Sequence, residues 1–489
     1  MLYCISAMPD YVIKIKTNLD SVMEAVVLPY WVFVVLIIFA SIMVLDRLIM
    51  PSMRWYLNRR VNRVITKINS RLDIKIRPFQ FTRRQALIDQ LVFDNKVIDA
   101  IKEYAEDNDM PQAIAQSKAR IYASEIVPAF NAYIYFKVGY WLAKTVARMI
   151  YRVRVGFYDN DKISAINADS SVVFVMNHRS NMDYILVSFL VAEKTTLSYA
   201  VGEWARIWPL QMLIKSMGAF FVRRNSGNPL YRKVLERYVN LSTRAGVCQA
   251  VFLEGGLTKD GVLRDPHLGF LDYMLRDYHP HTDKDIVFVP VGINYDRVLE
   301  DRSLIRQPDG SANNKSFGYV LKTTLIFLFK TTMLSRKNRW RRFGYASVNF
   351  GEPISAKHYC QTNTVDFSAL EAEERFTHVG SLARFIMGHI SDIVPVVPSA
   401  LMSTILLEHA DSWKSELQLK MFCLEKINQL KMAGAPIDIS NSAMENVLSG
   451  ALTAMIGRGL LEEKNNLYKV KASERDLFNY YANSISQWN

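Results

Sequence analysis

Residues 171–183 read SVVFVMNHRSNMD, and the character of the sequence changes sharply at Asn177. The first six residues are mostly apolar and β-branched, a composition typical of a strand that is buried on both faces. The rest of the stretch is mostly polar and places a histidine five positions before an aspartate. In an open α/β sheet, the loops at the carboxyl ends of strands deliver side chains into the ligand cleft. This stretch therefore predicts a central strand that ends in a functional loop.

Similar apolar runs recur on either side of this strand and alternate with helical stretches, for example 231–245. The predicted strands are 172–176, 219–222, 250–253, 286–291 and 347–350. Continuous apolar strands that are separated by helices favour a largely parallel sheet with helices on both faces. The predicted fold class is therefore α/β, with a central, largely parallel sheet flanked by helices.

The chain has 489 residues, which is more than one compact domain usually contains. We predict a tail and membrane anchor over 1–51, a helical region over 52–155, an α/β domain over 156–360 and a mainly helical domain over 361–489. The last domain contains predicted helices at 400–407 and 413–431, and a short hairpin at Asn465 and Asn466. Helices followed by a hairpin occur in winged-helix proteins, but no basic recognition helix accompanies them, so we expect no nucleic-acid partner.

Residues 26–45 read VVLPYWVFVVLIIFASIMVL and contain no charge. Twenty helical residues span roughly 30 Å, the thickness of a bilayer's hydrocarbon core, so this run is predicted to cross the membrane once. Two lysines precede the run, whereas the five arginines 47, 54, 59, 60 and 63 follow it. The positive-inside rule then places the large C-terminal part on the cytoplasmic side of the cell membrane.

Two other apolar segments leave a choice open. Residues 131–151 read NAYIYFKVGYWLAKTVARMIY, and residues 319–342 combine an apolar stretch with the basic tail SRKNRWRR. Each segment is consistent with an interfacial helix whose basic side chains reach lipid headgroups. For the first segment a packed helix is the favoured interpretation, whereas the second fits a solvated loop beside a core helix equally well.

His178 and Asp183 are the candidate catalytic pair. Five residues on a regular helix correspond to a 500° rotation, which would align the two side chains poorly. We therefore expect His178 in the loop and Asp183 on the first turn of the following helix, with Ser180 or Asn181 as its cap. In that arrangement Asp183 accepts from one ring nitrogen and leaves the other as a general base.

Three further strand ends carry polar or glycine-rich sequences that are predicted to reach the same cleft. Arg223 and Arg224 follow one strand, and their guanidinium groups suit phosphate oxygens. A second strand end reads FLEGGLTKDG; it supplies a carboxylate and a lysine, and its glycines allow close approach of the backbone to an anion. A third reads VPVG, where the proline is expected at the last ladder position. The candidate binding residues are Arg223, Arg224, Glu254, Gly255, Gly256, Lys259 and Pro290.

Composition restricts the partners and cofactors. The formal net charge of +13 favours acidic partners such as phosphorylated molecules, acidic carrier proteins and anionic lipid surfaces. The four cysteines are far apart and form no CxxC pair, which indicates neither a disulfide framework nor a cysteine-rich zinc site. His279 and His281 form only a short HxH pair beside Pro280, so we expect no metal.

NHRSNMD, GAFFVRR, FLEGGLTKDG and VPVGINY resemble, in order and spacing, the four motifs of the glycerolipid acyltransferase superfamily. The glycerol-3-phosphate and dihydroxyacetone-phosphate acyltransferase branch is the most similar, because GAFFVRR, NFGEP at 349–353 and NYYANSI at 479–485 also match it. The resemblance covers roughly residues 130–489. One departure lies in the third motif, where members commonly carry Arg-Ser-Arg after EGG and this chain has Leu257 and Lys259 in place of the two arginines.

The resemblance implies a glycerol-3-phosphate 1-O-acyltransferase that moves a fatty acyl group from acyl-CoA or acyl-carrier protein directly to glycerol 3-phosphate. His178, oriented by Asp183, is then the base, and Arg224, with Arg223 and Lys259, holds the phosphate. Glu254 positions the acceptor hydroxyls or these cations, and amides near Ser180 or Gly256 are candidate oxyanion donors. Membrane lipids are the remaining expected partners, and no cofactor is expected. A lysophosphatidate or dihydroxyacetone-phosphate acyltransferase and a catalytically silent lipid-binding or scaffold protein remain as alternatives.

Overall fold

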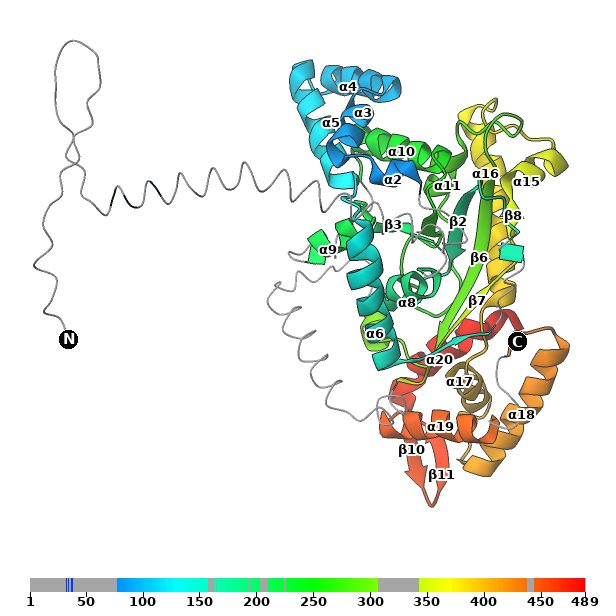
Figure 1. Cartoon of the computed structure of the whole chain (residues 1–489). Coiled ribbons are helices and arrows are strands. Elements are labelled where there is room, and N and C mark those ends of the chain that lie inside the picture. Colours follow the sequence, from blue (N-terminus) through cyan, green and yellow to red (C-terminus); the bar gives the residue numbers. More distant parts are fainter. Residues whose placement is uncertain are drawn as a thin grey trace, which may run out of the picture. The chain divides into compact units, whose positions relative to one another are not determined.

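The computed structural model describes Val32, Val34, Ile37 and residues 77–156, 162–163, 165–192, 195–202, 210–223, 226–306, 343–437 and 444–488. The chain divides into two compact units, Met1–Ser70 and Arg71–Asn489. The second unit contains the sheet and all the helices described below, drawn in colour in Figure 1. Nearly all of the predicted membrane span 26–45, Arg224 and the whole of 319–342 lie outside the described residues.

The sheet has eight strands in the order β1-β7-β6-β2-β5-β3-β4, with β8 paired to β6. The strands are β1 (Arg152–Val155), β2 (Ser171–Met176), β3 (Ser198–Val201), β4 (Phe220–Phe221), β5 (Gln249–Phe252), β6 (Ile286–Tyr295), β7 (Tyr345–Phe350) and β8 (Ile354–Ser355). Pairing is parallel except where β6 meets β7 and β8. The predicted α/β class with a largely parallel sheet is therefore confirmed.

Helices cover both faces of this sheet (Figure 1). The helices before β5 are α2 (Pro78–Phe81), α3 (Arg84–Val92), α4 (Asn95–Asp107), α5 (Gln112–Ile126), η1 (Ile134–Gly139), α6 (Tyr140–Ile150), α8 (Met182–Val191), α9 (Leu210–Ser216) and α10 (Pro229–Arg244). The later ones are α11 (Gly269–Leu275), α12 (Asp301–Arg306), α15 (Ala356–Asn363), α16 (Ala372–Ile393), α17 (Pro398–Glu408), α18 (Glu416–Met432), α19 (Met444–Gly457), η4 (Ala472–Glu474), α20 (Arg475–Ala482) and η5 (Asn483–Trp488). A small second sheet pairs β9 (Lys414–Ser415), β11 (Leu467–Val470) and β10 (Leu461–Lys464).

Strand β2 shows why the sequence predicted the centre of the fold. All six of its residues are buried. Val172, Phe174 and Met176 belong to the core that α6, α8, α17 and α20 share, whereas Val173 and Val175 belong to the core beneath α10, α11 and α16. Because both faces of the strand are covered by helices, its residues show no polar alternation.

Three details of the predicted elements require correction. Residues 152–155 lie in the region predicted to be helical but form β1 at the edge of the sheet, and the short strand β3 was not predicted. Pro290 was expected to end its strand, but β6 continues to Tyr295. On one side β6 pairs with β8 at Val287 and Phe288 and then with β7 from Val291, so the proline sits in the gap between two partners. A missing N–H costs little at such a position.

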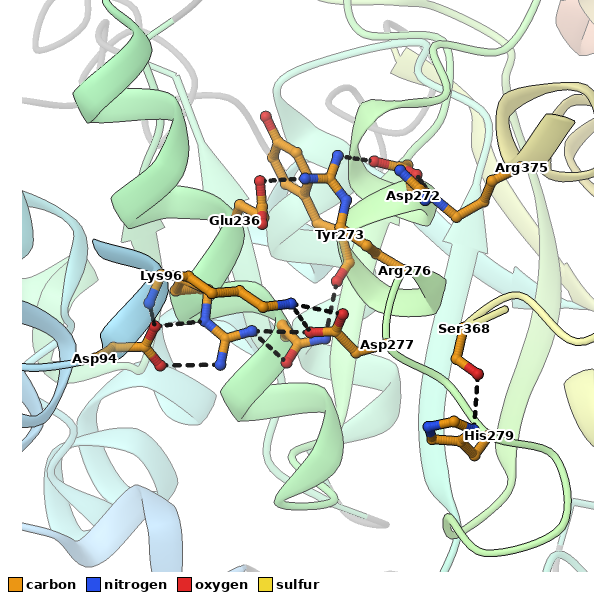
Figure 2. A network of polar contacts seen from close by, with 12 residues as sticks. Asp94, Lys96, Glu236, Asp272, Tyr273, Arg276, Asp277, His279, Ser368 and Arg375 are labelled. Carbon is orange, nitrogen blue, oxygen red and sulfur yellow. Dashed lines mark hydrogen bonds and ion pairs between the residues drawn. The ribbon is translucent and has the colours of Figure 1, made fainter. Parts of the chain in front are cut away.

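A buried ion-pair network fixes the helices before β1 and the C-terminal helix α16 to α10 and α11 (Figure 2). Arg237 of α10 donates to both oxygens of Asp94, at 3.0 and 2.9 Å, and to Asp277 at 2.9 Å. Arg375 of α16 donates through Nε to Asp272 Oδ1 at 2.8 Å. Removing one member of a buried pair typically costs about 3–5 kcal/mol, because a charge is left uncompensated. These contacts therefore hold segments that are far apart in sequence on one scaffold.

Among the described residues, no single helix has both the length and the hydropathy of a membrane span. Helices α16 and α17 reach the length and apolar composition of a membrane span only when they are taken together, and a bend of 85° separates them.

Candidate active site

Residues 177–183, called the catalytic turn here because they carry the candidate pair His178 and Asp183, begin where β2 ends. Strand β2 lies between the parallel strands β5 and β6, so its carboxyl end is at the centre of the sheet. The Asn177 side chain then binds the backbone of Ile293 in β6, donating to the carbonyl at 2.9 Å and accepting from the amide at 2.7 Å. These two bonds hold the start of the turn against the neighbouring strand.

His178 and Asp183 are in direct contact and buried. His178 Nδ1 lies 2.9 Å from Asp183 Oδ2, and the side chains are 2% and 0% exposed. Asp183 lies on the first turn of α8, as expected. Its Oδ2 also accepts the amides of Arg179 and Ser180, at 2.7 and 3.0 Å, and its Oδ1 accepts the Tyr295 hydroxyl at 2.6 Å. Four donors therefore fix this carboxylate in one orientation.

The imidazole of His178 presents its second nitrogen without a partner. The ring stacks on Phe252 with the centroids 4.0 Å apart, and the edge of Tyr184 meets it at 5.5 Å. Nε2 is buried and has no hydrogen-bond partner among the described residues. When Nδ1–H donates to Asp183, Nε2 carries the lone pair, and the group can act as a general base.

Glu254 joins the catalytic turn to the glycine-rich loop after β5. Its Oε1 accepts the backbone N–H of His178 at 2.8 Å, and its Oε2 accepts that of Arg264 at 3.0 Å. Burial raises the pKa of this carboxyl, and the two amides partly oppose that rise. Thr258 N–H donates to the His178 carbonyl at 3.2 Å. Glu254 was expected to position acceptor hydroxyls or cations, whereas the structure shows it positioning the His178 backbone.

The glycine-rich loop makes further close contacts that restrict its sequence. Gly255 has a φ of +66°, and a Cβ there would lie 2.5 Å from His267 Cδ2, so both conformation and space favour glycine. The buried guanidinium of Arg179 donates from Nη1 to the Gly261 carbonyl at 2.6 Å. Lys259 is half-buried in the same loop.

Of the two candidate phosphate-binding arginines, Arg223 is the one that the structure describes. Arg223, after β4, forms a bidentate pair with Glu125 of α5 (Nε–Oε1 3.1 Å, Nη2–Oε2 2.7 Å) and lies over the rings of Tyr122 and Tyr231. Glu125 raises the pKa of Arg223. Arg223 therefore binds α5 to the end of β4. Pro290 lies inside β6, where its carbonyl accepts the Gly351 amide at 2.8 Å.

Two residues of this site were not assigned a role from the sequence. Tyr295 holds Asp183 from the far end of β6. Alternation along a strand places Tyr295 on the same face as Val291 and Ile293, toward α8, which is a signal that the sequence does contain. Glu300 accepts the Ser180 hydroxyl at 2.8 Å and the Asn181 side-chain amide at 3.1 Å. Nothing in the sequence indicates this contact, which spans about 120 residues.

We expect Glu300→Ala to lower kcat by about 10- to 100-fold while KM for both substrates changes little, because the turn that carries His178 loses an anchor. Glu300→Gln should stay close to the wild type. Its amide oxygen can accept from Asn181, and the Ser180 hydroxyl can accept from its NH2 group. Steady-state kinetics of the three proteins check this, and equal losses in both variants would contradict it.

Comparisons with known proteins agree with these motifs. Residues 154–294 match the family model described as acyltransferase, and residues 328–488 match the model of the glycerol-3-phosphate acyltransferase C-terminal region. Proteins named glycerol-3-phosphate acyltransferase are similar to this chain. Those from Pseudomonas entomophila, Pseudomonas aeruginosa (strain LESB58) and Actinobacillus succinogenes are 27%, 27% and 28% identical over 83%, 87% and 82% of it. The resemblance drawn from the four motifs is confirmed.

The chain spans about half the length of the curated relatives it matches, since the aligned regions cover 49%, 51% and 49% of those three proteins. A crystal structure of a 1-acyl-sn-glycerophosphate acyltransferase from Thermotoga maritima is 17% identical, with a TM-score of 0.29 over 52% of this chain and 78% of that one.

Proposed function

We propose that this chain transfers a fatty acyl group from an acyl thioester to the 1-hydroxyl of glycerol 3-phosphate, which gives lysophosphatidate. The buried His178–Asp183 pair carries the proposal, because no residue in the described part of the chain binds the His178 Nε2 at the carboxyl end of the central strand. The match of 328–488 to the C-terminal region of glycerol-3-phosphate acyltransferases favours this acceptor over lysophosphatidate.

The reaction balances with the groups in the site. His178 Nε2 removes the proton of the acceptor hydroxyl while its oxygen attacks the thioester carbonyl. The tetrahedral intermediate then collapses, the C–S bond breaks, and the thiolate takes the proton from the imidazolium. Because the Ser180 amide already donates to Asp183, the Gly256 amide is the better of the two candidate oxyanion donors. No step needs a metal or a redox cofactor.

Measuring acyl transfer with labelled acyl-CoA or acyl-carrier protein and three acceptors tests the proposal. Glycerol 3-phosphate should be used at least tenfold more efficiently than dihydroxyacetone phosphate or lysophosphatidate, as judged by kcat/KM. Faster turnover of lysophosphatidate would replace the proposed acceptor, and transfer to none of the three would favour a silent lipid-binding role.

We expect Arg224→Ala to raise the KM for glycerol 3-phosphate by about 10- to 100-fold and to leave the KM for the thioester nearly unchanged. A charge-assisted hydrogen bond contributes about 1.5–3 kcal/mol, and Arg224 is the arginine of the pair that is proposed to hold the phosphate. Arg223→Ala is the matched control. It should mainly lower the melting temperature, because Glu125 loses its partner. The assignment fails if Arg224→Ala raises both Michaelis constants equally.

The catalytic unit is proposed to work at the cytoplasmic surface of the cell membrane, anchored by residues 26–45. The charge-free composition of that run supports the anchor. The exposed side of η1 and α6 supports a surface contact, because Trp141 is 63% exposed beside Val138 and Leu142, with Lys137 and Arg148 on the same helices. Helix α6 packs on α8, whose first turn carries Asp183.

In full-length protein reconstituted with brominated phospholipids, we expect Trp141→Phe to remove a distinct component of the lipid-induced fluorescence quenching, because bromine quenches only by contact. Trp413→Phe is the control, since Trp413 is 36% exposed and lies before α18, away from α6. Equal changes in the two variants would rule out lipid contact at α6.

A further inference from the structure

A cavity lies among α17, α19, α20 and the start of β7, apart from the catalytic turn. Its volume is about 460 Å³, within the 300–1,000 Å³ typical of small-molecule sites. Neither His178 nor the glycine-rich loop lines it. Figure 1 shows these three helices gathered at one end of the sheet.

Two serine hydroxyls on α17 line this cavity. Ser399 and Ser403 are 6% and 0% exposed. The Ser403 Oγ has no hydrogen-bond partner among the described residues, whereas the Ser399 hydroxyl faces Asp296 and opposes the rise in the pKa of that carboxyl. The two residues are four positions apart on a helix, so their hydroxyls lie on the same face. A buried polar group that is left unpaired costs about 1–3 kcal/mol, so Ser403 indicates a polar occupant.

The charges around the cavity are predominantly positive. Among the described residues that line it, Arg152, Arg297 and Arg458 are basic and Asp296 alone is a carboxylate. Both oxygens of Asp296 already accept backbone amides, from Ser399 at 2.9 Å and Tyr345 at 2.8 Å. Burial raises the pKa of this carboxyl, and its hydrogen bonds from Tyr345 and Ser399 oppose that rise. Arg458 also pairs with Asp301 behind the wall.

The opposite wall leaves room for a ligand. Helix α19 contributes the small residues Gly450, Ala451 and Ala454 to it. A Cβ built on Gly450 would meet no atom within 4 Å. Glycine inside a helix costs about 1 kcal/mol relative to alanine. The packing around Gly450 does not require a glycine, because a side chain there would meet no neighbour.

We propose that this cavity binds a small phosphorylated molecule, at a site distinct from the acceptor site. Guanidinium groups present planar forks of donors that match phosphate oxygens, and the two serine hydroxyls supply further donors from α17. The site is linked to the catalytic turn indirectly. Arg458 and Tyr481 bind Asp301, and Glu300, the residue before it, binds Ser180 of the turn.

Equilibrium dialysis of the full chain with labelled pyrophosphate tests this proposal. Gly450→Leu places a side chain in the cavity and should weaken binding at least tenfold or remove one binding site. Gly457→Leu is the matched control, because it makes the same change at the exposed end of the same helix, where a Cβ also meets no atom within 4 Å and no lining residue is altered. Any pyrophosphate bound at the acceptor site contributes equally to both variants.

The double variant Ser399→Ala and Ser403→Ala gives a second test that adds no bulk. It should also weaken pyrophosphate binding, with a melting temperature close to that of the wild type, since the orphaned Ser403 hydroxyl is removed together with the Ser399 hydroxyl that faces Asp296. Wild-type affinity in both Gly450→Leu and the double serine variant would overturn the proposal. So would binding of citrate, a carboxylate anion, with no binding of pyrophosphate.

Discussion

His178→Ala should lower kcat for acyl transfer by about 10²–10⁴-fold, the range that a positioned general base contributes. The backbone contacts of the turn do not depend on the imidazole, because Glu254 accepts the amide of residue 178 and Thr258 donates to its carbonyl. Asp183 keeps its two amide donors and the Tyr295 hydroxyl. The variant should therefore fold, and its loss should appear in kcat and not in the amount of native protein.

His279→Ala serves as the control for this experiment. His279 is 56% exposed and binds Ser368 on the loop that precedes α16, so its removal should leave kcat within a factor of two. Circular dichroism and thermal melting of both variants establish that each is folded. Unchanged acyl transfer in folded His178→Ala would remove the histidine from catalysis.

The central strand and its turn could be predicted because their signals are local. The apolar run of β2, the polar turn and Asp183 lie within thirteen consecutive residues, and the helical periodicity rules out a single helix carrying both catalytic groups. The other motifs followed from the rule that strand ends gather at one edge of a parallel sheet. The hairpin at Asn465 and Asn466 was predictable for a similar reason, since both adopt the positive φ that such turns favour.

What could not be predicted depends on contacts between distant segments. β1 reads RVRV, alternates charge with valine and is too short to stand out beside a helical region. Arg223 has the chemistry of a phosphate ligand, and only the fold brings Glu125 to it across 98 residues. Likewise, no local pattern shows that Glu254 points toward the backbone of His178 and not toward a substrate. The sequence indicates which side chains are charged or polar, but it does not indicate which group each of them binds in the fold.

Asp183→Asn is expected to lower kcat by at least about 10²-fold while the protein stays folded. The amide oxygen can replace Oδ2 and still accept Nδ1–H and the two turn amides, which leaves the NH2 group facing Tyr295. The Tyr295 hydroxyl can then rotate and accept, so every polar group remains paired. What is lost is the negative charge that stabilises the imidazolium as it forms. In a serine-protease triad the same change costs about 10⁴-fold because the wrong histidine tautomer is held, whereas here the two turn amides keep the amide oxygen toward Nδ1–H.

Tyr295→Phe separates the charge of Asp183 from its position. Removing the hydroxyl leaves Oδ1 without its donor but keeps the negative charge and the three N–H donors on Oδ2. We therefore expect kcat to fall by about tenfold or less, near the lower limit for one hydrogen bond to a charged group. Comparing kcat, KM and melting temperature across Asp183→Asn, Tyr295→Phe and the wild type gives the measurement. If Asp183→Asn matched Tyr295→Phe in kcat, orientation and not charge would be the contribution of Asp183. If both matched the wild type, the pair would have no part in proton transfer.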